Sequence, residues 1–274
     1  MNGIPAALSA SVLWGSADFL AGRATRTHPV LLVAFLGQAA GLIVLSAILA
    51  FHGIDAHALL PGAITGLIGI VGVLALYSAL GLGTMSIVAP IGATSAIVPV
   101  VWGIAGGERP GALQWAGVVL ALIGVILAAR EPTTGGSKDA KNAIRLALLA
   151  ALAIGFSLVT LDKAAEHDSL TGVFAARATS VPLLGIALLA ARVRLPRAKA
   201  LAGMGGIGLL DTSANVAFAI ATTGGLLSLV SVLGGLFPVV TVALAYALLH
   251  ERLARPQRVG VVLALVGVPL ISAG

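Results

Sequence analysis

The chain has 274 residues, of which 59% are hydrophobic and 9% are charged, and its mean hydropathy is +1.09. A soluble domain carries roughly 25% charged residues, so this composition excludes a soluble globular protein and indicates a surface that faces lipid. The net charge of +6 does not indicate a nucleic-acid partner, because the basic residues stand singly or in short clusters between apolar runs.

Apolar segments long enough to cross about 30 Å of hydrocarbon follow one another along the chain. Every backbone polar group must be paired inside a bilayer, and the alternating pattern of strands is absent, so each segment is predicted to be a helix. The predicted fold class is all-α: a polytopic membrane protein of ten transmembrane helices, with no separate soluble domain. The predicted spans are 4–22, 30–51, 59–80, 84–106, 112–129, 143–161, 172–191, 201–222, 226–249 and 256–273.

An internal repeat relates the two ends of the chain. The segment GVVLALIGV at 117–125 returns as GVVLALVGV at 260–268, an offset of 143 residues. The same offset relates Glu108-Arg109 to Glu251-Arg252. The repetition of this acid–base pair predicts a structural role in capping and charge pairing at a hairpin.

The repeat divides the chain into two halves, residues 1–129 and 143–274, joined by a polar linker at 130–142. Gly15 in VLWGS parallels Gly155 in LAIGF, which extends the likeness to the first helix of each half. Because each half contains five predicted spans, an odd number, the two copies are expected to cross the membrane in opposite senses. Inverted repeats of this kind suit alternating access about a site near the midplane. A purely structural duplication is the alternative.

Lysine and arginine are distributed unevenly between the predicted connections. Thirteen of them lie in odd-numbered connections and two in even-numbered ones, while Arg177 lies within a span. Positive residues are retained on the cytoplasmic side of a membrane. The count therefore predicts that odd-numbered connections face the cytoplasm and that both termini lie outside.

Three motifs carry a resemblance to a known family. They are VLWGSADFL in the first span, YSALGLGTMSIVAPIGA across the third and fourth, and FPVVTVALAYALLHERL followed by GVVLALVGVPLI in the ninth and tenth. On these motifs the chain resembles EamA-like transporters of the drug/metabolite transporter superfamily over nearly its full length. The family's proline thirteen residues before Glu-Arg is matched by Pro238, whereas the first half has Ser95 there and Pro99 four residues on.

The resemblance implies a ten-helix fold in the cell membrane, with a central cavity lined mainly by spans one, three, four, six, eight and nine. It implies export of amino acids, other metabolites or drugs, without a catalysed reaction, and it implies that Tyr77 lies close to the cavity. By family analogy both termini would be cytoplasmic, which conflicts with the orientation predicted from the charge count.

Ionisable residues inside hydrocarbon are costly and mark pathways or coupling sites; the candidates here are Asp18, Arg177 and Asp211. Asp211 lies at the middle of the eighth span, so it must be paired, protonated or exposed to a cavity. Arg177 lies about 6–7 Å by helix rise from the centre of its own span, the seventh, and the adjacent antiparallel span is expected to bring its guanidinium near Asp211. A structural ion pair and a role in substrate or proton coupling both stay open.

Asp18 lies near the end of the first span, where the following basic loop carries Arg23 and Arg26. An interfacial salt link to this loop is the favoured interpretation. The functional alternative is a gate or proton acceptor at the mouth of the pathway.

The predicted substrate-binding residues are Trp14, Tyr77, Asp211, Asn215 and Phe218. Asn215 and Phe218 follow Asp211 by four and seven residues, which places all three on one helix face. An acid, an amide and an aromatic ring on one stripe suit an amine-bearing solute. Trp14 shares a face with Asp18 by the same spacing. Structural hydrogen bonding between helices is the alternative for Asn215.

The predicted hinges are Pro90, Pro99 and Pro238, because proline frees a carbonyl and kinks a helix. Gln38 corresponds to Arg177 in the repeat, and a structural role is favoured for its amide. The five histidines lie in loops or at span ends without the spacing of a metal site.

We predict a secondary transporter, an exporter of small metabolites such as amino acids or amines, or of drugs. Its expected partners are a small-molecule substrate and the lipid bilayer, and it is expected to act as a monomer. The sequence shows no ATP-binding P-loop, and no metal or other cofactor is expected. The alternatives are a facilitative exchanger or uniporter without proton coupling and, from another class, a membrane-embedded enzyme or a structural membrane protein. No converging catalytic set supports an enzyme.

Overall fold

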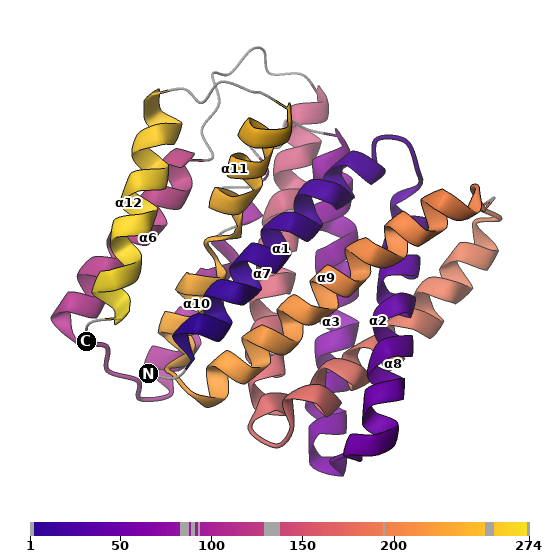
Figure 1. Ribbon diagram of the computed structural model, residues 1–274, viewed down its shortest axis with the longest axis horizontal. Helices are drawn as coiled ribbons and strands as arrows, with labels where there is room; N and C mark the ends of the chain where they lie inside the picture. Colours follow the sequence, from indigo (N-terminus) through magenta and orange to yellow (C-terminus); the bar gives the residue numbers. More distant parts are fainter. Residues whose placement is uncertain are drawn as a thin grey trace.

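The computed structural model describes residues 3–82, 88, 91–92, 94–128, 138–193, 195–249 and 255–272. Across these residues the regular elements are all helices (Figure 1), which confirms the predicted all-α class. They are α1 (Ile4–Ala24), α2 (Val30–His52), α3 (Ala56–Leu82), the 3₁₀ turn η1 (Thr94–Ala96), α5 (Ile97–Ala105), α6 (Ala112–Ala128), α7 (Lys138–Ala165), α8 (Ser169–Ala190), α9 (Ala198–Thr223), α10 (Leu227–Gly234), α11 (Phe237–Leu249) and α12 (Arg255–Ser272).

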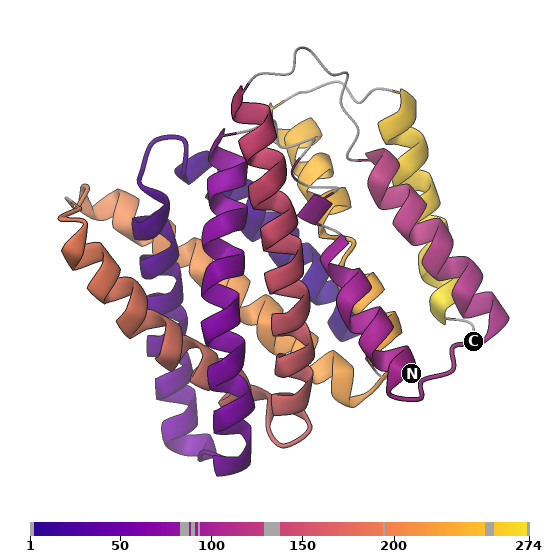
Figure 2. The same cartoon turned by 180° about the vertical axis from the view of Figure 1, so that it is seen from behind.

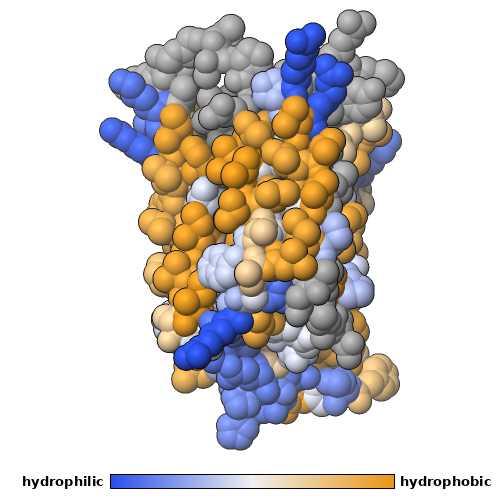
Figure 3. Space-filling view, turned by 90° about the vertical axis from the view of Figure 1, so that its left-hand side faces the viewer, coloured by the Kyte–Doolittle hydropathy of each residue, from blue (hydrophilic) through white to orange (hydrophobic). Residues whose placement is uncertain are grey.

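Six of the described helices, α1, α2, α3, α7, α8 and α9, are long and apolar enough to cross a membrane. At 1.5 Å of rise per residue, the 21 residues of α1 span about 30 Å, the thickness of the hydrocarbon layer. The remaining apolar helices are shorter. Figure 3 shows a broad hydrophobic band between hydrophilic side chains at either end of the molecule, as expected for a protein surrounded by lipid.

The helices of one half pack mainly against helices of the other. The α3 helix lies against α7 and α8, while α1 and α2 lie against α9; α6 and α12 lie side by side at one edge, as Figures 1 and 2 show. Gly37 of α2 and Gly208 of α9 approach each other closely: a Cβ on Gly208 would lie 2.1 Å from the Cα of Gly37. Small residues therefore let these helix backbones touch.

Gly15 and Gly155, which occupy corresponding positions in the two halves, make equivalent contacts. A Cβ on Gly15 of α1 would lie 2.6 Å from the carbonyl oxygen of Phe237, at the start of α11. A Cβ on Gly155 of α7 would lie 2.7 Å from the carbonyl oxygen of Ser95, just before α5. Each half thus packs its first helix on the other half in the same way.

The predicted span 226–249 is not one continuous helix, contrary to our prediction: α10 ends at Gly234 and α11 begins at Phe237. Pro238 has no N–H to donate to the Gly234 carbonyl four residues earlier, so the hydrogen-bond ladder stops there. Pro99 is buried within α5, and Pro90 lies outside the described residues. The role of these prolines as hinges stays a prediction.

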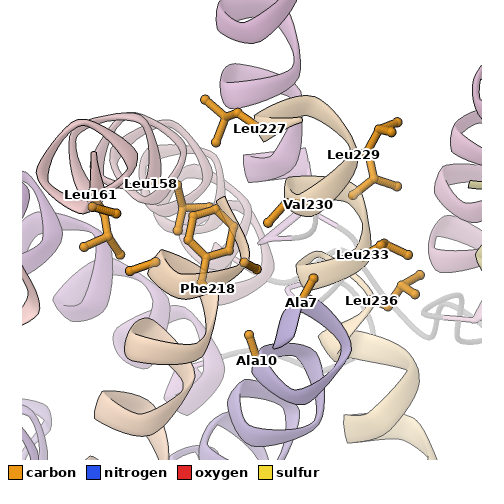
Figure 4. Close-up of a cluster of buried hydrophobic side chains, with 14 of the residues drawn as sticks. Ala7, Ala10, Leu158, Leu161, Phe218, Leu227, Leu229, Val230, Leu233 and Leu236 are labelled. Carbon is orange, nitrogen blue, oxygen red and sulfur yellow. The ribbon is translucent and has the colours of Figure 1, made fainter. Parts of the chain in front are cut away.

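All eight residues of α10 are buried. Figure 4 shows its leucine and valine side chains in one cluster with Ala7 and Ala10 of α1, Leu158 and Leu161 of α7, and Phe218 of α9. This apolar core holds α10 in the interior of the molecule, beside the cavity described below.

Asp168 fixes the connection between α7 and α8. Its Oδ1 accepts a hydrogen bond from the Thr171 backbone N–H at 2.6 Å, which caps α8, and its Oδ2 lies 3.2 Å from Nε2 of His52. Partial burial acts to raise the pKa of Asp168, but the hydrogen bonds from Thr171 and the contact with His52 outweigh it and lower that pKa below its ordinary value.

Candidate functional site

A central cavity lies where the two halves meet. The segments expected from the resemblance all contribute to its wall, through α1, α3, η1, α7, α9, α10 and α11. The α2 and α8 helices also line it, which the resemblance did not imply. Its polar wall residues include Trp14, Asp18, Gln38, Tyr77, Ser95, Arg177, Ser180, Asp211, Asn215 and Ser231.

The predicted proximity of Arg177 and Asp211 is present in the structure. Arg177 Nη2 donates to Asp211 Oδ2 at 2.7 Å, and the two side chains are 7% and 18% exposed. Arg177 Nη1 donates to Gln38 Oε1 at 2.6 Å, and the Ser180 hydroxyl donates to the same oxygen at 3.0 Å. Three helices, α2, α8 and α9, are thus joined by one buried polar cluster, so Gln38 connects the halves by bonding to its own repeat counterpart.

Asn215 lies on the cavity wall next to Asp211, as its spacing predicted. Its Nδ2 donates to the Asp211 backbone carbonyl at 2.7 Å, and lies 3.4 Å from Asp211 Oδ1. Part of its hydrogen-bonding capacity is therefore used within α9 and not between helices, and its role in substrate binding stays a prediction.

Phe218 is not among the residues that line the cavity, and its contact with a substrate stays a prediction. Its side chain is wholly buried, with its ring centroid 5.6 Å from that of Trp14. The reason is that α10 covers this part of the α9 face: a Cβ on Gly234 would lie 3.4 Å from the Phe218 ring. Trp14 itself lines the cavity, and the Phe218 ring packs against the Trp14 ring.

Asp18 lines the cavity, and the favoured salt link to the basic loop is wrong. Within the described part of the chain its carboxylate forms no ion pair with Arg23 or Arg26. Since Trp14 and Asp18 are one helical turn apart, the face of α1 that carries Trp14 into the cavity carries Asp18 there too. Tyr77, almost fully buried on α3, lines the same space.

The model of the EamA-like transporter family matches this chain over residues 1–130 and again over 141–273. The chain belongs to the EamA-like transporter family. This family lies within the drug/metabolite transporter superfamily, so the protein is an integral membrane protein of a transporter family with a two-repeat architecture.

No curated protein matches the chain. A protein of known crystal structure is similar to this EamA-like chain with a TM-score of 0.81, over 99% of this chain and 96% of its own. The two sequences are 18% identical, so the likeness shows a shared fold.

Two buried polar atoms of this EamA-like protein have no hydrogen-bond partner among the described residues and belong to cavity residues: Nε of Arg177 and Oγ of Ser231. Buried polar atoms are normally satisfied. Ser231 lies on α10, three residues before the break that Pro238 explains. An unpaired hydroxyl at this place is a candidate ligand contact that spacing alone did not single out.

Glu108 has a structural role of longer range than the predicted cap at its own hairpin. Its Oε1 accepts from the backbone N–H of Leu227 at 2.7 Å, and its Oε2 accepts from that of Ser228 at 3.0 Å. Glu108 therefore caps the first turn of α10, in the other half of the chain. Its repeat counterpart Glu251 lies outside the described residues.

Proposed function

We propose that the protein is a secondary transporter that exports small metabolites such as amino acids or amines, or drugs, across the cell membrane. Transport would follow alternating access around the central cavity. The observation that carries this proposal is the cavity itself: both halves line it, and it holds charged side chains at its wall. Charged groups in a membrane interior are retained at substrate and ion pathways.

Ten spans in two inverted repeats, residues 1–129 and 143–274, are part of the proposal. The equivalent packing of Gly15 and Gly155 supports it, because two copies of one unit that meet about an axis in the membrane plane make such reciprocal contacts.

A facilitative exchanger or uniporter is the second candidate. Asp211 is paired with Arg177, and this ion pair occupies a carboxylate that a proton-coupled carrier could otherwise use, which favours transport without proton coupling.

The experiment is uptake and efflux of labelled amino acids, amines and cationic drugs in proteoliposomes, with and without an imposed pH gradient. Gradient-driven movement of one class supports the coupled exporter. Movement that ignores the gradient supports the facilitator, and movement of no solute contradicts both.

Orientation needs a separate measurement, because the charge count and the family analogy disagree. We propose the orientation of the charge count, with odd-numbered connections in the cytoplasm. The chain has no cysteine, so labelling of a single introduced cysteine shows on which side of the membrane that position lies. Labelling of intact cells with a membrane-impermeant maleimide should modify Ile54→Cys, in the second connection, and spare Thr27→Cys, in the first. The reverse result establishes the family's orientation.

A further inference from the structure

The described cavity wall holds more acidic than basic side chains. Its ionisable carboxylates are Asp18 and Asp211, and its described basic side chain is Arg177. Arg177 directs its two terminal nitrogens at Asp211 and Gln38. Among the described residues no cationic side chain is left for Asp18.

An unpaired carboxylate inside a membrane protein is costly unless a cation or a proton neutralises it. Asp18 is not needed for the polar cluster that joins α2, α8 and α9, because Arg177 already has its carboxylate partner there. A structural explanation that accounts for Asp211 therefore does not account for Asp18.

The surroundings of Asp18 suit an organic cation with an apolar body. Trp14 lies one turn away on the same face, and its ring is fixed by Phe218 on one side and by Gly234, whose Cβ would lie 3.3 Å from it. The face of an indole ring attracts ammonium groups. The rest of the wall is largely apolar; it includes Ile70, Val73, Leu76, Leu158 and Leu161.

We propose that the cavity binds organic amines as monocations, with the ammonium group paired to Asp18 and the apolar body against Trp14 and the aliphatic wall. This site rests on the proposed function, and it narrows the substrate class of the transporter from small metabolites in general to amines. A carboxylate ligand would meet Asp18 unpaired and would find both terminal nitrogens of Arg177 already engaged.

The test is direct binding to the purified full-length protein in lipid nanodiscs, by calorimetry, without any transport step. The probes are phenylethylamine, its neutral N-acetyl derivative and phenylacetate, which share the ring and differ in charge. Phenylethylamine should bind, and both other probes should bind about tenfold or more weakly, as expected from the loss of one charge-assisted contact.

Asp18→Asn should weaken phenylethylamine binding by about tenfold or more. Asp55→Asn is the matched control, because Asp55 lies in the α2–α3 connection, away from the cavity; it should bind the amine as the wild type does. Circular dichroism and the thermal midpoint show that each variant is folded, and an Asp18→Glu variant that restores binding shows that the charge matters.

Equal binding of the amine and its acetylated form overturns the proposal, as does undiminished amine binding by folded Asp18→Asn or failure of the wild type to bind the amine. These outcomes are distinct from failure of the proposed function. Amine binding without transport of any solute would refute the transporter and keep the site, whereas transport of another class without amine binding would refute only the site.

Discussion

Neutralising Asp211 alone should destabilise the protein strongly. In Asp211→Asn the guanidinium of Arg177, 7% exposed, keeps Gln38 as its remaining partner but loses the charge that balances it. Breaking one side of a buried ion pair costs about 3–5 kcal/mol, because the other charge is left buried and uncompensated. That is a large part of the total stability of roughly 5–15 kcal/mol of a folded domain.

Neutralising both partners should cost less than the single changes predict. In Arg177→Gln with Asp211→Asn, no charge is left buried, and the two amides can still hydrogen-bond to each other. We expect the effects of the two single variants to fall short of additivity by about 0.5–3 kcal/mol, the range for residues in direct contact.

The assay is reversible unfolding of the purified protein in mixed micelles, with the four members of the double-mutant cycle compared at one lipid ratio. Asp55→Asn serves as the control for loss of a carboxylate outside the cluster. The reasoning is refuted if Asp211→Asn is as stable as the wild type, or if the single effects simply add. Either result would mean that Arg177 and Asp211 do not stabilise each other, which would return both residues to a role in binding or coupling.

Three further predictions concern packing and capping. Gly208→Ala should lower stability by about 1–3 kcal/mol because its Cβ would collide with the backbone of Gly37. A Cβ at Gly203 meets nothing within 4 Å, so Gly203→Ala should be neutral or stabilising. The thermal midpoints of the two variants test this difference. Glu108→Ala should cost about 1 kcal/mol and speed hydrogen exchange of the first amides of α10. Asp168→Asn should destabilise the protein at neutral pH. Because the pKa of Asp168 is lowered on folding, its contribution to stability is present above its ordinary pKa and is lost as the pH falls through the lowered one. Thermal midpoints of the wild type and the variant, measured at decreasing pH, should therefore converge in acid.

Simple physical rules were sufficient to predict the all-α class and the contact between Arg177 and Asp211. Hydrocarbon thickness sets the length of a span, and the cost of a lone charge in lipid requires a partner. The position of Asp18 was predicted wrongly, because distance from the end of a span does not show whether a side chain faces the bilayer surface or an internal cavity. Phe218 was on the predicted helix face, but α10 covers that part of it.

The break between α10 and α11 and the cap from Glu108 depend on different kinds of information. Pro238 was recognised as a perturbing residue, yet a proline inside a span can either bend a helix or end it, and the difference depends on the neighbouring helices. The cap joins residues more than a hundred positions apart in the sequence. The spacing between Glu108 and the residues around it carries no trace of that contact.

The repeat preserves packing more closely than it preserves chemistry, and this difference bears on the amine site. Gly15 and Gly155 make the same kind of contact in their two halves. Three residues after each of them stand Asp18 and Leu158, and both line the cavity. If a carboxylate were required by the way the halves pack, an apolar residue could not occupy the equivalent place in the second half. The charge of Asp18 therefore has no counterpart in the shared architecture, which is the expected pattern for a residue retained for the ligand.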